Sequence, residues 1–148
     1  MNNKMTIALI LLAVGSGGAA ANETVNTENG VAIKGYDPVA YFTDSEPVKG
    51  SPDITYEWGG ATWQFASEDH RDLFAENPES YAPEYGGYCA WAVAHNSLAD
   101  IDPNAWHIED GRLFLNVSRI VKFRWRARMN HHIEEGDANW PSIREGLE

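Results

Sequence analysis

A single cysteine, Cys89, is the feature that most constrains how this chain of 148 residues can fold. One thiol forms no internal disulfide, and it cannot supply a cysteine-rich zinc or iron–sulfur centre. The fold must therefore be held together by apolar packing. With 43% hydrophobic and 11% aromatic residues, the chain can build such a core, and its length fits one domain.

The first 21 residues have the pattern of a secretory signal peptide. Lys4 precedes an apolar run at 7–14, and small residues fill positions 15–21. We predict cleavage after Ala21, which would place the mature chain in the periplasm or outside the cell. An anchoring N-terminal helix is the alternative. No second long apolar run follows, so the mature chain is expected to need no membrane.

The mature chain is expected to hold one domain at 31–148, preceded by a disordered polar segment at 22–30. Two hairpins are predicted. Apolar and polar residues alternate on either side of Gly59-Gly60, which is typical of a β-hairpin. The second is predicted at 107–115, because Asp110-Gly111 suits a type I′ turn between two short strands.

Two helices are predicted as well. Ser67 is a suitable N-cap for a helix that ends at Asn77-Pro78, with Leu73 and Phe74 turned to the core. Farther on, apolar residues recur every four positions and predict a helix of about four turns that packs on a sheet. These residues are Val117, Val121, Trp125 and Met129. A turn is expected at 137–141, and the fold class that results is α+β.

Charge excludes some partners and suggests another. The formal net charge of −11 repels nucleic acid and anionic lipid, so neither is an expected general partner. Basic residues are nevertheless concentrated in the last predicted helix: Arg119, Lys122, Arg124, Arg126 and Arg128. They form either a solvated face that pairs with the protein's own acids or a docking surface for an acidic partner or an anionic ligand.

Several motifs together resemble the YHS domain, and in particular its exported bacterial branch, in which a signal peptide precedes a single domain. They are GYDPVAYF at 35–42, WQFAS at 63–67, NPESYAP at 77–83, YGGYCA at 85–90, DGRLFLN at 110–116 and DANWP at 137–141. The resemblance implies a small α+β unit and a metal-binding module, since YHS domains occur in copper-transporting ATPases. Metal-binding relatives carry cysteines where this chain has Ala40, Ala66 and His70.

The resemblance therefore carries a metal ligand over only at His70. Cys89 is the second candidate, because a thiol is a soft ligand for Cu(I). The alternatives are that Cys89 is a small buried residue with an inert thiol, and that His70 is a surface or capping histidine. The pair could hold linear Cu(I), but it supplies too few ligands for tetrahedral zinc.

Two functions follow from the sequence. The first is a non-enzymatic exported protein that binds a metal, with copper the most plausible, through Cys89 and His70. The second is a metal-free module that docks to a periplasmic protein through an aromatic or basic helix surface. No catalytic motif appears, so an enzyme is not favoured. The remaining histidines are scattered in sequence: His95, His107, His131 and His132. The adjacent residues His131 and His132 are expected to be solvated at the end of the last predicted helix, and a surface metal contact is the alternative.

Overall fold

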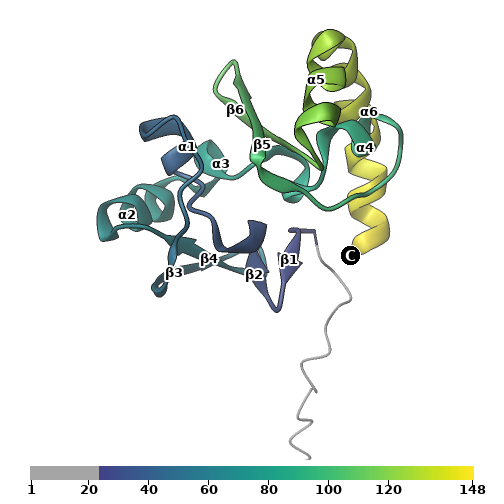
Figure 1. The fold of residues 1–148 in the computed structure, drawn as a ribbon. Helices are drawn as coiled ribbons and strands as arrows, with labels where there is room; N and C mark the ends of the chain where they lie inside the picture. The colour runs from purple at the N-terminus through teal and green to yellow at the C-terminus, as the bar shows by residue number, and fades with distance from the viewer. Residues whose placement is uncertain (1–23) are drawn as a thin grey trace, which may run out of the picture.

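The computed structural model describes residues 24–148, so the predicted signal peptide and its cleavage site lie outside the described residues. An N-terminal sheet has the strand order β1-β2-β4-β3, and a separate hairpin is made of β5 and β6. Figure 1 shows the sheet with α1, α2 and α3 on one side of the molecule and β5, β6, α4, α5 and α6 on the other. The predicted α+β class is confirmed.

Both predicted hairpins are confirmed. β3 (Ser51–Trp58) pairs antiparallel with β4 (Ala61–Phe65), and β5 (Asp102–Glu109) pairs antiparallel with β6 (Arg112–Asn116). The turn residues have positive φ, at 63° and 79° for Gly59 and Gly60 and at 50° and 73° for Asp110 and Gly111. Two central residues of positive φ match the twist of the strands that they join, which explains the choice of glycine and aspartate.

The N-terminal segment differs from the expectation. Disorder was predicted over 22–30, but within the described part β1 (Thr27–Glu28) pairs with β2 (Val31–Ala32), and Val25 is buried. β2 in turn pairs parallel with β4. The predicted disorder is wrong for 24–30. A polar segment can still be ordered when its backbone forms hydrogen bonds with a neighbouring strand, and composition does not reveal such pairing.

Short helices lie on both sides of the first hairpin in the sequence. Before it come η1 (Ile33–Gly35) and α1 (Ala40–Thr43). After it come α2 (Glu68–Glu76), α3 (Pro78–Tyr81), η2 (Glu84–Gly87) and α4 (Ala90–Ala94). The predicted cap is confirmed, since Ser67 Oγ accepts a hydrogen bond from the His70 amide at 3.2 Å. Phe74 is fully buried as expected, whereas Leu73 is 38% exposed and does not face the core.

The C-terminal region forms two helices instead of one helix and a turn. α5 (Arg119–Ala127) ends early, and α6 (Met129–Leu147) continues through Pro141. The predicted turn at 137–141 is therefore wrong. Pro141 removes one helical donor, but the flanking Trp140 and Ile143 pack on the second core cluster, and this packing holds the helix. Trp125 is buried as predicted, but Val117 precedes α5 and is 42% exposed.

β6 lies between two core clusters. Leu113 and Leu115 face the larger cluster, which also holds Trp63 and Phe74, while Phe114 faces the smaller cluster with Trp125. Successive side chains of a strand point to opposite faces, so three consecutive apolar residues of one strand contribute to both clusters. No helix of residues 24–148 has the length and apolar character that crossing a membrane requires.

The close approach of α6 to η2 gives a first testable prediction. A Cβ on Gly136 would lie 2.6 Å from Tyr85 Oη, and Tyr85 is buried, whereas a Cβ on Gly146 of the same helix meets nothing within 4 Å. Gly136→Ala is therefore expected to lower the free energy of unfolding by about 1–3 kcal/mol. Gly146→Ala should raise it by up to about 1 kcal/mol, because alanine has the higher helix propensity.

Chemical denaturation of the two variants beside the parent chain measures both effects. Opposite signs are the expected result. Equal stabilisation by the two alanines would show that Tyr85 yields without cost and that the contact between α6 and η2 is loose.

Candidate functional site

Cys89 precedes α4 and is 1% exposed. Its Sγ accepts a hydrogen bond from the Val117 amide at 3.3 Å and donates to Asn116 Oδ1 at 3.6 Å. Burial raises the pKa of the thiol, although backbone hydrogen bonds from Ala92, Val117 and Trp91 oppose the shift. A buried thiol with a raised pKa is a poor nucleophile and a poor metal ligand at neutral pH.

His70 lies in α2 and both of its ring nitrogens are engaged. Nδ1 is 2.6 Å from Asp37 Oδ2, and Nε2 is 3.2 Å from Thr43 Oγ1. Asp37 is fully buried and also accepts three backbone hydrogen bonds, from the amides of Val39, Ala40 and Ala66 at 2.9, 3.2 and 2.9 Å. The carboxylate thus ties α1, the end of β4 and α2 together, with His70 as one of its donors.

The structure does not bring Cys89 and His70 together. Their hydrogen-bond partners have no residue in common, and α2 and α4 lie on opposite sides of the molecule in Figure 1. Within residues 24–148, no group of three or more histidine, cysteine or acidic side chains is arranged to hold a metal ion. Copper binding by this pair stays a prediction, and nothing in the geometry favours it.

Asp37, His70 and Thr43 follow each other in the order of a hydrolase triad, carboxylate to imidazole to hydroxyl. Thr43 Oγ1 also lies 3.3 Å from the Val39 carbonyl and 2.9 Å from Asp44 Oδ1. Its single proton therefore has acceptors other than the imidazole. We assign the three residues a structural role. The sequence singled out His70 but did not reveal its contacts with Asp37 and Thr43, because the three residues are separated along the chain and meet only in the folded structure.

A second polar cluster joins three of the sequence motifs. The Arg112 guanidinium contacts Glu84 at 3.1 Å and Asp137 at 2.7 Å, and Tyr85 Oη donates to Asp137 Oδ1 at 3.0 Å. Burial alone would raise the pKa of Asp137, but the hydrogen bonds from Arg112 and Tyr85 outweigh it and lower that pKa. Every acid in this cluster has a partner, which is the arrangement of a structural clamp between β6, η2 and α6.

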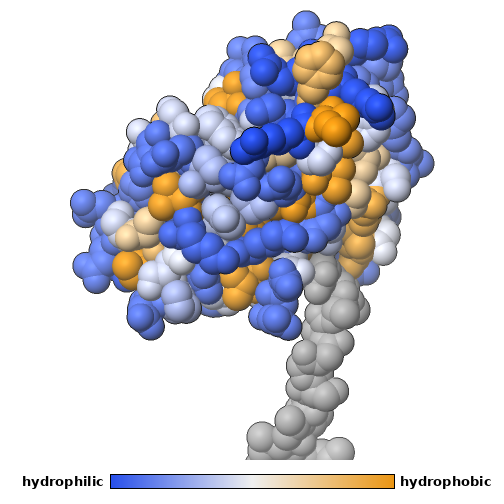
Figure 2. Space-filling model, in the orientation of Figure 1, coloured by the Kyte–Doolittle hydropathy of each residue, from blue (hydrophilic) through white to orange (hydrophobic). Residues whose placement is uncertain are grey.

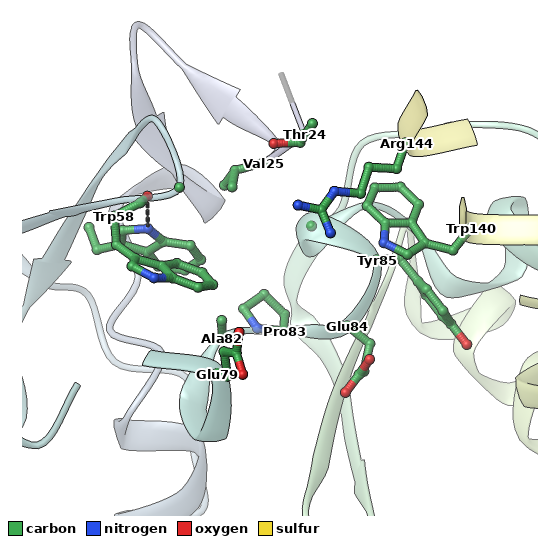
Figure 3. A pocket seen from close by; sticks show the side chains of 13 residues that line it. Thr24, Val25, Trp58, Glu79, Ala82, Pro83, Glu84, Tyr85, Trp140 and Arg144 are labelled. Atoms are coloured by element: carbon green, nitrogen blue, oxygen red, sulfur yellow. Dashed lines mark hydrogen bonds between the residues drawn. The ribbon is translucent and has the colours of Figure 1, made fainter. Parts of the chain in front are cut away.

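An aromatic pocket of about 310 Å³ lies beside this clamp (Figure 3). Trp58 stands on one side, and Trp140 and Arg144 stand opposite, while Glu79 and Glu84 lie at the lower rim in that view. The tryptophans serve both core and pocket, because Trp63 and Trp125 are fully buried, whereas Trp58 and Trp140 are partly exposed at this pocket.

The outer face of α5 is the most unusual surface of the described chain. Elsewhere in residues 24–148, Lys34, Arg71, Arg112 and Arg144 each form an ion pair, and Lys49 lies over the Tyr36 ring at 5.3 Å. The five basic residues at 119–128 form no ion pair within the described residues. Between them, Phe123 is 75% exposed and Ile120 is 68% exposed. Figure 2 shows apolar side chains next to strongly hydrophilic ones at the top of the molecule, where α5 lies. The bases are therefore largely solvated, as one interpretation of the sequence expected, but within residues 24–148 they do not pair with the protein's own acids.

Comparison of the chain with protein-family models, with curated proteins and with solved structures found no match. The resemblance to the YHS domain rests on the sequence motifs and stays a prediction.

Proposed function

We propose that this chain is an exported interaction module, a YHS-like domain that docks through α5 to a protein carrying an acidic surface with an apolar pocket. In this proposal the signal peptide is removed after Ala21 and the mature domain works in the periplasm or outside the cell. The surface that we call the α5 face consists of the five basic residues together with Ile120 and Phe123. The observation that carries the proposal is the absence of ion pairs for these bases within the described residues.

Three features of α5 destabilise the isolated domain. Lys122 and Arg126 are separated by about one helical turn, and like charges at this spacing repel. Burial and the charges of Arg126 and Arg119 lower the pKa of Lys122. The first turn contains Arg119 and no acid, which opposes the helix dipole. A sequence that departs from local preferences in one place is typical of a binding site.

The exposed apolar residues indicate what kind of partner relieves these costs. Phe123 and Ile120 are separated by three positions, so they share one side of the helix, as the anchors of a helix that binds in a groove do. An acidic rim around an apolar groove would match both the bases and the two anchors. The remainder of the chain is strongly acidic, so an acidic partner is expected to approach through this face and to be repelled elsewhere.

The test begins with a photo-reactive phenylalanine analogue at position 123 in living cells. A single cross-linked partner is the expected result, and its binding to the purified chain is then measured. Reversal of two charges, in the variant Arg124→Glu with Arg128→Glu, should weaken binding tenfold or more, which corresponds to about 1.4 kcal/mol. Phe123→Ser should weaken it to a similar degree, because aromatic anchors dominate interface energies.

A matched control makes the same change in net charge on other surfaces. The variant Arg71→Glu with Arg144→Glu should bind the partner as the parent chain does. Equal losses in both double variants would mean that only net charge matters and would contradict the proposal. A cross-link to a second copy of this chain, tight binding to vesicles of phosphatidylglycerol, or no cross-link at all would contradict it as well.

A further inference from the structure

Two histidines stand beside one indole where α4 meets α6. His95 is the C-cap of α4, and His132 lies in the first turn of α6. The Trp91 ring centroid is 4.4 Å from that of His95 and 4.7 Å from that of His132, and the two imidazole centroids are 5.8 Å apart. Residues far apart in the sequence thus form a compact aromatic group.

Hydrogen bonds fix the tautomer of both imidazoles. His95 Nδ1 is 2.7 Å from the Trp91 carbonyl oxygen, and His132 Nδ1 is 2.9 Å from the Trp125 carbonyl oxygen. A carbonyl only accepts, so each Nδ1 carries the proton and each neutral ring has its lone pair on Nε2. Metal-binding histidines are held in this way, with the other ring nitrogen donating to a backbone carbonyl.

The Nε2 atoms are left without a protein partner among the described residues. The His132 residue is only 6% exposed, and the one hydrogen bond of its side chain is made by Nδ1. Among the described residues only Asn116 Nδ2 and Trp125 Nε1 are fully buried without a partner, so the Nε2 atom of His132 keeps access to solvent or to a ligand. The Nε2 atoms of His70 and His107, by contrast, have protein partners, since they contact Thr43 and Glu109 at 3.2 and 2.8 Å. His95 and His132 are therefore free to bind something through Nε2.

The spacing of the two rings suits a shared metal ion. An imidazole nitrogen binds zinc at about 2.0–2.1 Å, so the centroids of two rings on one ion are at most roughly 6.5 Å apart. The observed 5.8 Å lies within this limit. Asn139 fixes the relative position of the two helices, since its Nδ2 donates to the carbonyls of Val93 and Ala94 at 3.0 and 3.2 Å.

We propose that His95 and His132 bind a late divalent transition-metal ion through their Nε2 atoms. Imidazole suits copper, nickel and zinc, and the Irving–Williams order makes Cu²⁺ the tightest of the three. The described chain adds no third histidine, cysteine or acid in a common cluster, so the remaining coordination positions are open to water or an external ligand. This site uses neither Cys89 nor His70, and it does not depend on docking through the α5 face.

The experiment is calorimetric titration of the purified chain with CuCl₂ and, separately, with ZnSO₄ in a buffer that does not chelate. We expect one Cu²⁺ per chain, bound more tightly than Zn²⁺. His95→Gln should weaken Cu²⁺ binding about tenfold or more, because one of two ligands is lost. His95 is exposed, so this variant should fold, and circular dichroism checks that it does. Electron paramagnetic resonance should show two nitrogen ligands in the parent and one in the variant.

Matched variants distinguish the possible sites. His107→Gln removes a histidine elsewhere and should leave binding unchanged. His131→Gln removes the exposed neighbour of His132 and should also have little effect. Absence of Cu²⁺ binding in the parent, or unchanged binding in His95→Gln, would overturn the proposal. Loss of binding in Cys89→Ser or His70→Gln, with His95→Gln unaffected, would overturn it in favour of the pair predicted from the sequence.

Discussion

Replacing Phe74 with alanine is expected to lower the free energy of unfolding by about 3–5 kcal/mol. The Phe74 ring is fully buried and lies within 6.1 Å of four other aromatic rings, those of Tyr56, Trp58, Trp63 and Phe65. Its removal leaves a cavity that rigid neighbouring rings cannot fill, and it also removes edge-to-face contacts. Such a loss is a large part of the usual stability of a single domain.

Its neighbour Leu73 provides the control, because it is in the same helix but 38% exposed. Leu73→Ala should lower the free energy of unfolding by well under 1.5 kcal/mol. Burial of a complete leucine side chain contributes at least about that much, and Leu73 is only partly buried. Urea denaturation followed by tryptophan fluorescence measures both variants. Similar losses for the two would show that α2 packs through Leu73 as well, and the aromatic cluster would no longer be the centre of the core.

Replacing Asp37 with alanine is expected to lower the free energy of unfolding by about 3–5 kcal/mol as well, because several donors lose one shared acceptor and each buried donor left unsatisfied costs about 1–3 kcal/mol. The change removes the acceptor of two buried amides, those of Val39 and Ala40, and of two partly buried donors, the Ala66 amide and His70 Nδ1. Unpartnered buried donors are more costly than the lost bonds themselves. The effect should be seen as a lower midpoint of thermal and urea unfolding.

Asp72→Ala is the matched control, because Asp72 is an exposed acid of α2 that pairs, among the described residues, with Arg71 alone. Its cost should be about 0–1 kcal/mol, the usual value of a surface ion pair. His70→Ala should fall between the two, since it leaves the backbone bonds to Asp37 intact. If Asp37→Ala were as stable as Asp72→Ala, the carboxylate would not hold α1, β4 and α2 together, and a functional role for the Asp37–His70–Thr43 series would have to be reconsidered.

The elements that depend on local signals could be predicted from the sequence. Both hairpins formed where glycine permits positive φ, and Ser67 capped its helix because its hydroxyl is next to the free amides of the first turn. The end of α2 before Asn77-Pro78 was also predicted from a local signal, since proline lacks the backbone N–H that a longer helix would need. These features involve residues a few positions apart.

Features that depend on distant contacts were predicted poorly. The turn expected at 137–141 is helical, because Trp140 and Ile143 gain more from packing on the second cluster than Pro141 loses. Val117 was expected to face the core from a four-turn helix, but α5 begins after it and leaves it exposed. The metal site expected at Cys89 and His70 stays a prediction, and the fold gives each of the two side chains its own hydrogen-bond partners.

By itself, the sequence determined that a chain with one cysteine builds its domain from apolar and aromatic packing around two hairpins and several helices. It also determined that its bases are concentrated in one segment, since composition and short-range spacing are properties of the chain alone. Only the tertiary structure decided which side chains are left without partners. Within residues 24–148 the bases at 119–128 form no ion pair, and His95 and His132 meet beside Trp91, because burial and hydrogen bonding depend on what the folded chain places next to each residue.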